Sequence, residues 1–246
     1  MVFLRHIGSR RELFVDDWLI EEVHDLRLML QQPAVKEVAL EFDAPWEGPT
    51  SGYVTVFHDE ECYRMYYRGA SEQADSEITA YAESADGINW TKPSLGTVAH
   101  ERWPDNNIIL TGDGTHNFVP FFDRNPLARP EHRYKALGSC PRFRRPGAPR
   151  EGALLPFTSA NALEWQLMID APALSDGAFD SQNVVFWDQL RGMYVAYVRD
   201  WRHGYRTIRR SVSQDFRHWS IPEWVDFGDT PEEDLYTSAI CPYFRA

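Results

Sequence analysis

Four polar segments, each directly before an apolar run, hold the side chains best suited to chemistry. They are Thr50-Ser51-Gly52, Thr115-His116-Asn117, Asp180-Ser181-Gln182-Asn183 and Glu233-Asp234-Leu235-Tyr236. Cleavage of a glycosidic bond needs two carboxyl groups, one that protonates the leaving oxygen and one that attacks the sugar or activates water. We therefore expect Asp180 and Asp234 to form this pair, with Glu233 in place of Asp234 if the strand register shifts by one residue. Ordinary turn residues in solvent are the alternative interpretation of all four segments.

The same segments, and the arginines near them, supply groups that can hold a sugar. Amide and imidazole groups suit sugar hydroxyls, aromatic rings suit a sugar face, and arginine suits a carboxylate or another anion. The expected hydrogen-bonding residues are His116, Asn117, Gln182 and Asn183, the stacking residues are Trp201 and Tyr236, and the anion-holding residues are Arg68, Arg199, His203 and Arg206. If the anion-holding residues bind phosphate as the nucleophile, the reaction is phosphorolysis rather than hydrolysis. A domain that binds sugar without cleaving it is the alternative outside catalysis.

One turn sequence occurs three times along the chain. Ser84 to Trp90 has the pattern Ser-x-Asp-x-x-x-Trp, Ser213 to Trp219 repeats it position for position, and Ser159 to Trp165 has Asn in place of Asp. Upstream of each copy an aromatic residue comes shortly before an aspartate in a hairpin turn, at Asp59, Asp123 and Asp188. We expect the aspartates of both kinds to bind the amides of their own turns, and the three tryptophans to pack between neighbouring repeats.

Repeats of this length, with about four strands in each, are typical of β-propeller blades. We predict an all-β fold in one propeller domain over residues 1–246, with about three and a half blades in the chain. The blades span residues 50–93, 115–170 and 180–222, and a fourth begins at 233–246. The innermost strands of a propeller surround its axis, which brings the four polar segments together. Because roughly 4–8 blades close such a ring, we expect further C-terminal blades as partners of this fold.

The composition argues against several classes of function. The formal charge is −12, from 37 acidic and 25 basic residues, which disfavours a nucleic-acid backbone or an anionic membrane as partner. Cys62, Cys140 and Cys241 are too few and too scattered for disulfides or zinc, so we expect free thiols and no metal. The glycine-rich stretch 111–114 lacks the Lys-Ser/Thr ending of a phosphate loop, and no cofactor is expected. No signal peptide or membrane-spanning stretch is recognisable, which favours a cytoplasmic protein.

Two other features have a functional and a structural interpretation. Asp16 and Asp17 look like a carboxylate pair, but adjacent strand residues face opposite ways, so we expect turn or edge positions for both. Residues 141–150 contain four arginines and three prolines. This composition predicts a stiff surface loop or, alternatively, a wall beside an anionic or sugar substrate.

Four stretches carry a family resemblance, at Leu13–Ile20, 84–90, Asp105–Ile108 and Tyr194–Arg199. Together they resemble a bacterial branch of the five-bladed β-propeller glycosidases, the group of the invertases, levansucrases, arabinanases and related mannoside phosphorylases. The resemblance implies five blades, a small-molecule or oligosaccharide substrate, and an axial site with acidic residues on the inner strands. The invertase motif Asn-Asp-Pro-Asn is absent, and Ser51 and Gly52 stand where arabinanases keep an aspartate. The resemblance therefore predicts the fold rather than individual catalytic roles.

Overall fold

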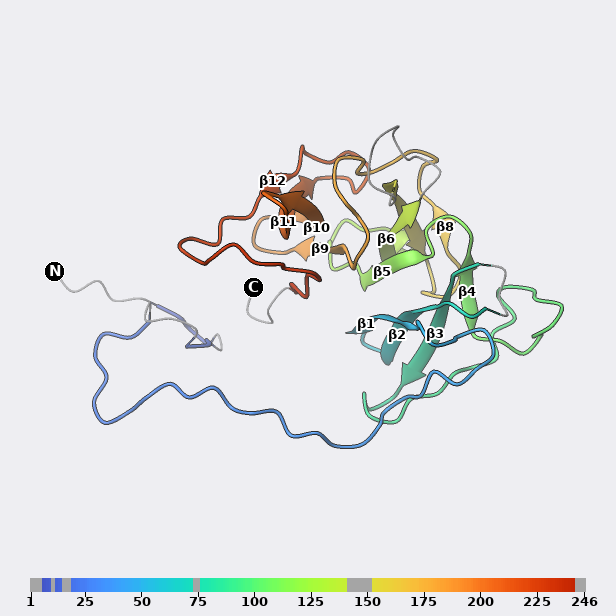
Figure 1. The fold of residues 1–246 in the computed structure, drawn as a ribbon, viewed down its shortest axis with the longest axis horizontal. Helices are drawn as coiled ribbons and strands as arrows, with labels where there is room; N and C mark the ends of the chain where they lie inside the picture. Colours follow the sequence, from blue (N-terminus) through green and yellow to red (C-terminus); the bar gives the residue numbers. More distant parts are fainter. Residues whose placement is uncertain (1–5, 10–11, 15–18, 73–75, 141–151, 242–246) are drawn as a thin grey trace. The chain divides into compact units, whose positions relative to one another are not determined.

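The computed structural model describes residues 6–9, 12–14, 19–72, 76–140 and 152–241 (Figure 1). The chain divides into two units, residues 1–38 with 243–246, and residues 39–242. The described residues of the first unit contain no helix or strand, and apolar side chains such as Leu26 and Leu30 are almost fully exposed. Asp16 and Asp17 lie outside the described residues. All the sheets belong to the second unit.

The second unit contains three four-stranded antiparallel sheets, each formed by strands that follow one another in the chain. The first sheet consists of β1 (Gly52–His58), β2 (Tyr63–Gly69), β3 (Ile78–Ser84) and β4 (Ile108–Thr111). The second consists of β5 (His116–Phe122), β6 (Tyr134–Cys140), β7 (Ala153–Ser159) and β8 (Gln166–Leu167). The third consists of β9 (Val184–Asp188), β10 (Met193–Arg202), β11 (Tyr205–Ser213) and β12 (Glu223–Trp224). A single 3-10 turn, η1 (Pro130–His132), is the only helical segment among the described residues.

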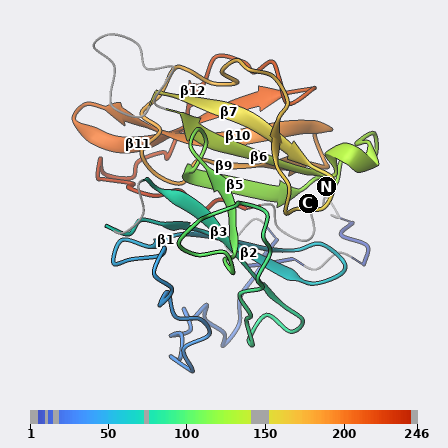
Figure 2. The ribbon, with the colours of Figure 1, turned by 90° about the vertical axis from the view of Figure 1, so that its right-hand side faces the viewer.

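The first strands of the three sheets lie innermost, with β5 in contact with both β1 and β9 (Figures 1 and 2). The central strands β6 and β7 are buried along their whole length, because their sheet is covered on both faces. The expected all-β architecture is confirmed, while the number of five blades stays a prediction. Residues 225–241 form no strand, so the beginning of a fourth blade also stays a prediction.

The first sheet extends further along the chain than its predicted blade. Its fourth strand, β4, comes well after residue 93, because the signature turn is followed by a long connection rather than by a strand. Asn107 directs this return: its main-chain oxygen accepts from the Tyr81 amide at 3.0 Å, and its side-chain amide donates to the Tyr81 oxygen at 2.6 Å. The edge strand is therefore specified by a buried asparagine that periodicity does not reveal.

The three signature turns have the predicted structural role. In the first copy the Asp86 carboxylate accepts hydrogen bonds from the amides of Ile88 and Asn89, each at 2.8 Å, and these bonds lower its pKa. The Trp90 indole donates to the Gly87 oxygen at 3.2 Å. The corresponding groups in the other two copies make the same contacts. The Asp-containing turns are thus confirmed as local caps.

The tryptophans of these turns differ in what they pack against. Trp165 meets Tyr66 of the first sheet edge-on, at 6.2 Å between ring centroids, and so lies between the first two sheets. Trp219 joins the core shared by the second and third sheets. Trp90 packs against the core of the first sheet, which Leu40, Phe42 and Trp46 also contact, so its predicted position between repeats stays a prediction. The segment before β1 covers the face that a neighbouring blade would otherwise cover.

Buried tyrosine–aspartate hydrogen bonds connect neighbouring sheets. Asp59, directly after β1, accepts from the Tyr134 hydroxyl of β6 at 2.6 Å. Asp123, directly after β5, accepts in the same way from Tyr194 of β10 at 2.7 Å. Burial opposes ionisation of Asp59, but hydrogen bonds from Tyr134 and Arg64 outweigh it and hold the pKa below its ordinary value. Asp59 and Asp123 therefore cap their own turns, as predicted, and also fix the next sheet.

We expect Tyr134→Phe to destabilise the protein by about 1–3 kcal/mol, because the buried Asp59 carboxylate loses one of its hydrogen bonds. Tyr63→Phe is the matched control, since Tyr63 begins β2 as Tyr134 begins β6 and its hydroxyl bonds to no other described residue. Urea unfolding of both variants measures the difference. Equal changes in the two variants would contradict a stabilising bond between the sheets.

Candidate active site

The inner ends of the three sheets bring together charged residues that are far apart in the sequence. In an antiparallel meander the first strand begins, the second ends and the third begins at the same end of the sheet. Arg68 is near the end of β2 and Glu77 directly precedes β3. His116 begins β5, and Asp180 lies just before β9. All four therefore reach the same end of the inner strands.

Two of the inner strands begin with a β-bulge. The register of β1 against β2 shifts between Gly52 and Thr55, and that of β5 against β6 shifts between His116 and Val119. The residue inside each bulge has a left-handed backbone, with φ of 51° at Tyr53 and 54° at Asn117. Positive φ is uncommon for residues other than glycine and often marks positions where function requires a particular side-chain direction. The bulges re-aim both side chains toward the inner end of the sheets.

His116 joins two carboxylates that come from different parts of the chain. Its Nδ1 lies 2.8 Å from Oε2 of Glu77, and its Nε2 lies 3.3 Å from Oδ1 of Asp180. An arginine flanks each carboxylate, with 3.6 Å from Arg68 to Glu77 and 3.6 Å from Arg199 to Asp180. The Glu77 and Asp180 side chains are 36% and 40% exposed, so a ligand can reach both.

The environment moves the pKa values of Glu77 and His116 in opposite directions. Burial opposes protonation of His116, but its hydrogen bond to Glu77 and the charge of that carboxylate outweigh burial and raise its pKa above 6.5. The hydrogen bond from His116 is the largest influence on Glu77 and lowers the pKa of this carboxyl group. The pair therefore combines a carboxyl group that loses its proton more readily than usual with an imidazole that holds its proton more strongly than usual.

Aromatic and cationic side chains continue the site along the third sheet. The Arg68 guanidinium lies over the Tyr53 ring, at 4.7 Å from its centroid. Arg206 lies between Trp201 and Tyr236, at 4.4 and 4.8 Å from their ring centroids. Burial and a hydrogen bond with Tyr236 raise the pKa of Tyr53. Tyr53 and Tyr236 thereby join the first sheet to the segment that follows the third.

The structure gives Asp180 and Asp234 different partners. Asp180 meets His116 and Arg199, whereas Asp234 accepts from the Arg206 amide at 2.9 Å and lies 3.4 Å from its guanidinium. The bond from the Arg206 amide is the first cause of the lowered pKa of Asp234. Glu233 is exposed and lines a separate cavity of about 510 Å³ beside β12. The carboxylate that shares a partner with Asp180 is therefore Glu77, and the pairing of Asp180 with Asp234 or Glu233 stays a prediction.

The other predicted ligands divide between the site and the scaffold. Asn117 belongs to the cluster, since its side-chain oxygen lies 3.5 Å from Nη1 of Arg68. Gln182 donates to the Thr55 hydroxyl at 2.6 Å and so attaches the start of the third sheet to β1. Asn183 is buried, and its amide bonds only to main-chain groups, which gives it a structural role. His203 pairs with Glu232 in an exposed hairpin. The arginine-rich residues 141–150 lie outside the described residues.

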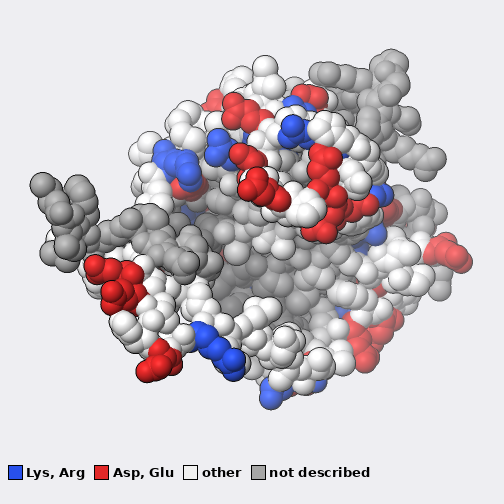
Figure 3. Space-filling view, turned by 60° about the vertical axis from the view of Figure 1, so that its left-hand side comes forward, with Lys and Arg blue, Asp and Glu red and all other residues white. Residues whose placement is uncertain are grey.

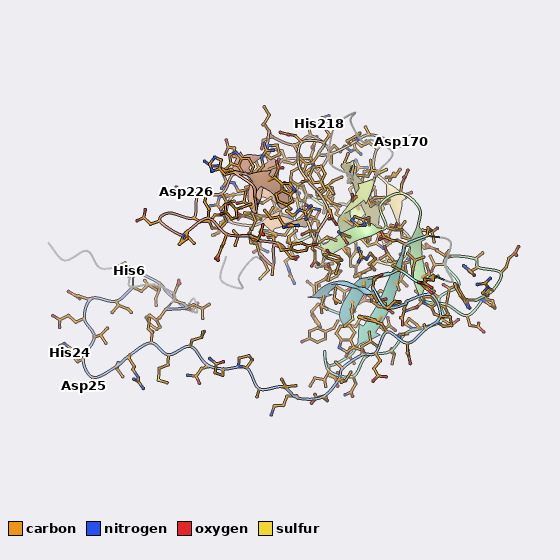
Figure 4. All side chains as sticks on the ribbon, viewed as in Figure 1. His6, His24, Asp25, Asp170, His218 and Asp226 are labelled. Carbon is orange, nitrogen blue, oxygen red and sulfur yellow. The ribbon has the colours of Figure 1, made fainter. Side chains whose placement is uncertain are left out.

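Sequence reasoning missed Glu77 and Tyr53. The topology offers a signal for Glu77, because the residue before the third strand lies at the same end of the sheet as the beginning of the first. No comparable signal exists for Tyr53, whose direction depends on the bulge. Other titratable side chains, such as Asp170, His218 and Asp226, lie on peripheral loops of their sheets (Figure 4).

An apolar cavity of about 440 Å³ lies along the inner strands, and its lining does not include Glu77, His116 or Asp180. Segments of β1, β5 and β9 line it together with residues 238–241.

Acidic and basic side chains are mixed on the face that Figure 3 presents. Within the described ranges, no three His, Cys, Asp or Glu side chains are grouped as metal ligands. Nor does that part of the chain contain a helix with the length and apolarity to cross a membrane.

Structures of known proteins share the fold. An endo-arabinase from Bacteroides thetaiotaomicron matches with a TM-score of 0.51 and 12% identity, over 76% of this chain and 65% of that one. A fructofuranosidase from Schwanniomyces occidentalis matches with a TM-score of 0.48 and 12% identity, over 76% and 37% of the two chains. A glycosyl hydrolase from Bacteroides ovatus matches with a TM-score of 0.46 and 13% identity, over 73% of this chain and 54% of that one.

The chain spans 37–65% of the length of these three proteins. No protein-family model and no curated protein matches the sequence. The likeness to the endo-arabinase agrees with three four-stranded sheets whose first strands lie innermost. The resemblance found in the sequence is confirmed at the level of the fold: the chain has a β-propeller architecture of the kind found in glycoside hydrolases.

Proposed function

We propose that the protein is a carbohydrate-active enzyme that hydrolyses glycosidic bonds at the inner ends of its sheets. The observation that carries this proposal is the contact of Glu77 and Asp180 with opposite nitrogens of His116. It brings two partly exposed carboxylates and an imidazole together on a propeller scaffold. The fold of the endo-arabinase supports the choice of a sugar as substrate, although fold alone is a weak argument for activity.

His116 is the proposed general acid and Asp180 the proposed base or nucleophile. Glu77 favours the protonated imidazole, which can then give its proton to the leaving oxygen of the sugar. Asp180, flanked by Arg199, has a partly exposed carboxylate that can attack the anomeric carbon or activate water. Glu77 acts through His116 and is a positioning residue.

Two other functions remain alternatives that experiment separates. Phosphorolysis requires cations that can hold a phosphate, but Arg68, Arg199 and Arg206 lie beside Glu77, Asp180 and Asp234, and His203 pairs with an exposed glutamate. These carboxylates disfavour a phosphate dianion at the same place. A domain that only binds sugar would retain the cluster and the aromatic rings of Trp201 and Tyr236, and would release no product.

We expect Asp180→Asn and His116→Gln to lower sugar release by about 10²–10⁴-fold, because each removes one proton-transferring group or nucleophile. The measurement is product release from a panel of glycosides and oligosaccharides, with and without inorganic phosphate. Asp226→Asn is the matched control, since Asp226 lies on an exposed loop after β12 and bonds only to the nearby Gly228 amide among the described residues.

Each outcome of this panel separates one of the three functions. Release that does not need phosphate and that Asp180→Asn abolishes supports hydrolysis. Release that requires phosphate would establish phosphorolysis instead. Sugar binding with no release from any glycoside would leave a binding propeller.

The pH dependence should reveal the link between Glu77 and His116. With a folded-state pKa raised above 6.5, His116 stays protonated to higher pH than a free histidine, so activity should fall only as pH rises through this elevated value. The contribution of this protonation to the free energy of unfolding is fully present below pH 6.5 and is lost as the pH rises through the elevated pKa of His116. Glu77→Gln should move both the alkaline limb of kcat/KM and the His116 ring titration to lower pH. Burial and the charge of Arg68 both lower the pKa of His116, and the substitution removes the carboxylate that opposes them.

The His116 titration is followed by NMR of the histidine ring signals, and kcat/KM is measured across the same pH range. The exposed His218 provides an internal reference in the same spectra, since its partner Asp215 is unchanged by the substitution. If Glu77→Gln lowers activity at every pH without moving the alkaline limb, the proposed role of Glu77 in holding the proton is wrong.

A further inference from the structure

Buried polar groups without partners gather around Arg68. Nε of Arg68, Nδ2 of Asn117, Oγ of Ser51 and Oγ1 of Thr79 have no hydrogen-bond partner among the described residues. Thr79 of β3 is the cross-strand partner of Arg68 and lies on the same face of the sheet. On the other neighbouring strand, β1, the partner of Arg68 is Gly52, which Ser51 directly precedes. Buried polar groups are nearly always paired in proteins, so such a group of unpaired atoms requires a ligand or another explanation.

The donors among these atoms suit an anion with two oxygens. Arg68 already uses its Nη atoms on the Thr50 oxygen, at 3.2 Å, and on the side-chain oxygen of Asn117, at 3.5 Å. Its Nε remains available, and the Asn117 amide, on a side chain that is 1% exposed, supplies a second donor nearby. A carboxylate has two oxygens, one for each of these donors, and the bond from the charged Arg68 is the stronger of the two.

The charge of the cluster favours a single negative charge on the ligand. In the proton-donating form proposed above, in which His116 is protonated, Arg68, Arg199 and His116 carry three positive charges and Glu77 and Asp180 carry two negative ones, which leaves one positive charge. A carboxylate balances this charge. A phosphate dianion would exceed it and would face the Glu77 carboxylate beside Arg68.

We propose that Arg68 and Asn117 form a subsite for the carboxylate of an acidic sugar, so that the substrate is a glycoside containing a uronic acid. This inference rests on the proposed function, because it names the substrate class of the same site. Tyr53 supports the subsite by stacking on the Arg68 guanidinium, which keeps its fork in one orientation. The left-handed backbone at Asn117 orients the amide toward Arg68.

The test compares the binding of D-glucuronate and D-galacturonate with that of D-glucose, D-galactose and inorganic phosphate by calorimetry. We expect the uronates to bind at least about tenfold more tightly than the neutral sugars, since a hydrogen bond to a charged group discriminates by this order. Arg68→Gln and Asn117→Gly should each weaken uronate binding by about 10–100-fold, a larger loss than either variant causes for the neutral sugars. Glycine adopts the positive φ of Asn117 without strain, so the second variant keeps the backbone.

Arg210→Gln is the matched control, because Arg210 is an exposed arginine on β11 that pairs only loosely with Glu223, at 3.8 Å. Equal binding of neutral and acidic sugars, binding of phosphate in preference to the uronates, or no binding of any of these probes would each overturn the subsite.

If one of these outcomes overturned the subsite while the protein still released sugar from neutral glycosides, the proposed hydrolysis would remain supported. Tight uronate binding that depends on Arg68, without sugar release from any glucuronide or galacturonide, would support the subsite and contradict the proposed function.

Discussion

The buried bond between a hairpin aspartate and the tyrosine of the next sheet is the constraint on which this structure depends. Asp59 and Asp123 each satisfy the amides of their own hairpin and accept a tyrosine hydroxyl from the following sheet. A carboxylate buried in this way is costly to leave unpaired. Each sheet can therefore dock in one orientation only, and the inner strands meet side by side. The apolar clusters between the sheets contribute buried surface area, while these hydrogen bonds determine the orientation in which the sheets dock.

The candidate site follows from that docking. Glu77 belongs to the first sheet, His116 begins the second, and Asp180 precedes the third, so their contacts exist only if the three sheets are correctly placed. The two bulges then direct Tyr53 and Asn117 toward the same place. Because the Glu77 and Asp180 side chains are 36% and 40% exposed, both carboxylates remain accessible to a ligand, while Glu77 raises the pKa of the imidazole between them.

Much of the fold could be predicted from the sequence, because the Ser-x-Asp/Asn-x-x-x-Trp turn has local chemistry that does not depend on distant residues. The strands themselves were also recognisable, and the residues beside them could therefore be placed at the inner end: Arg68, His116, Asn117 and Asp180. Glu77 was missed because its role comes from the alternation of strand ends, and Tyr53 because a bulge cannot be read from periodicity. The main-chain partners of the buried Asn183 amide could not be predicted, because they depend on how residues 179–183 fold back on themselves. The contacts of Trp90 with the core of its own sheet depend in the same way on tertiary packing, since Leu40, Phe42 and Trp46 cover that core too.

The central claim is that a sugar binds at the inner ends of the sheets, beside His116. The most direct measurement is the NMR spectrum of the histidine ring nitrogens while neutral and acidic monosaccharides are added to the protein. The account predicts that the His116 signals shift with saturation, whereas those of His203 and His218, which lie in exposed turns with their own carboxylate partners, stay in place. Saturable shifts at His203 or His218 with an unchanged His116 would contradict it, as would the absence of any shift.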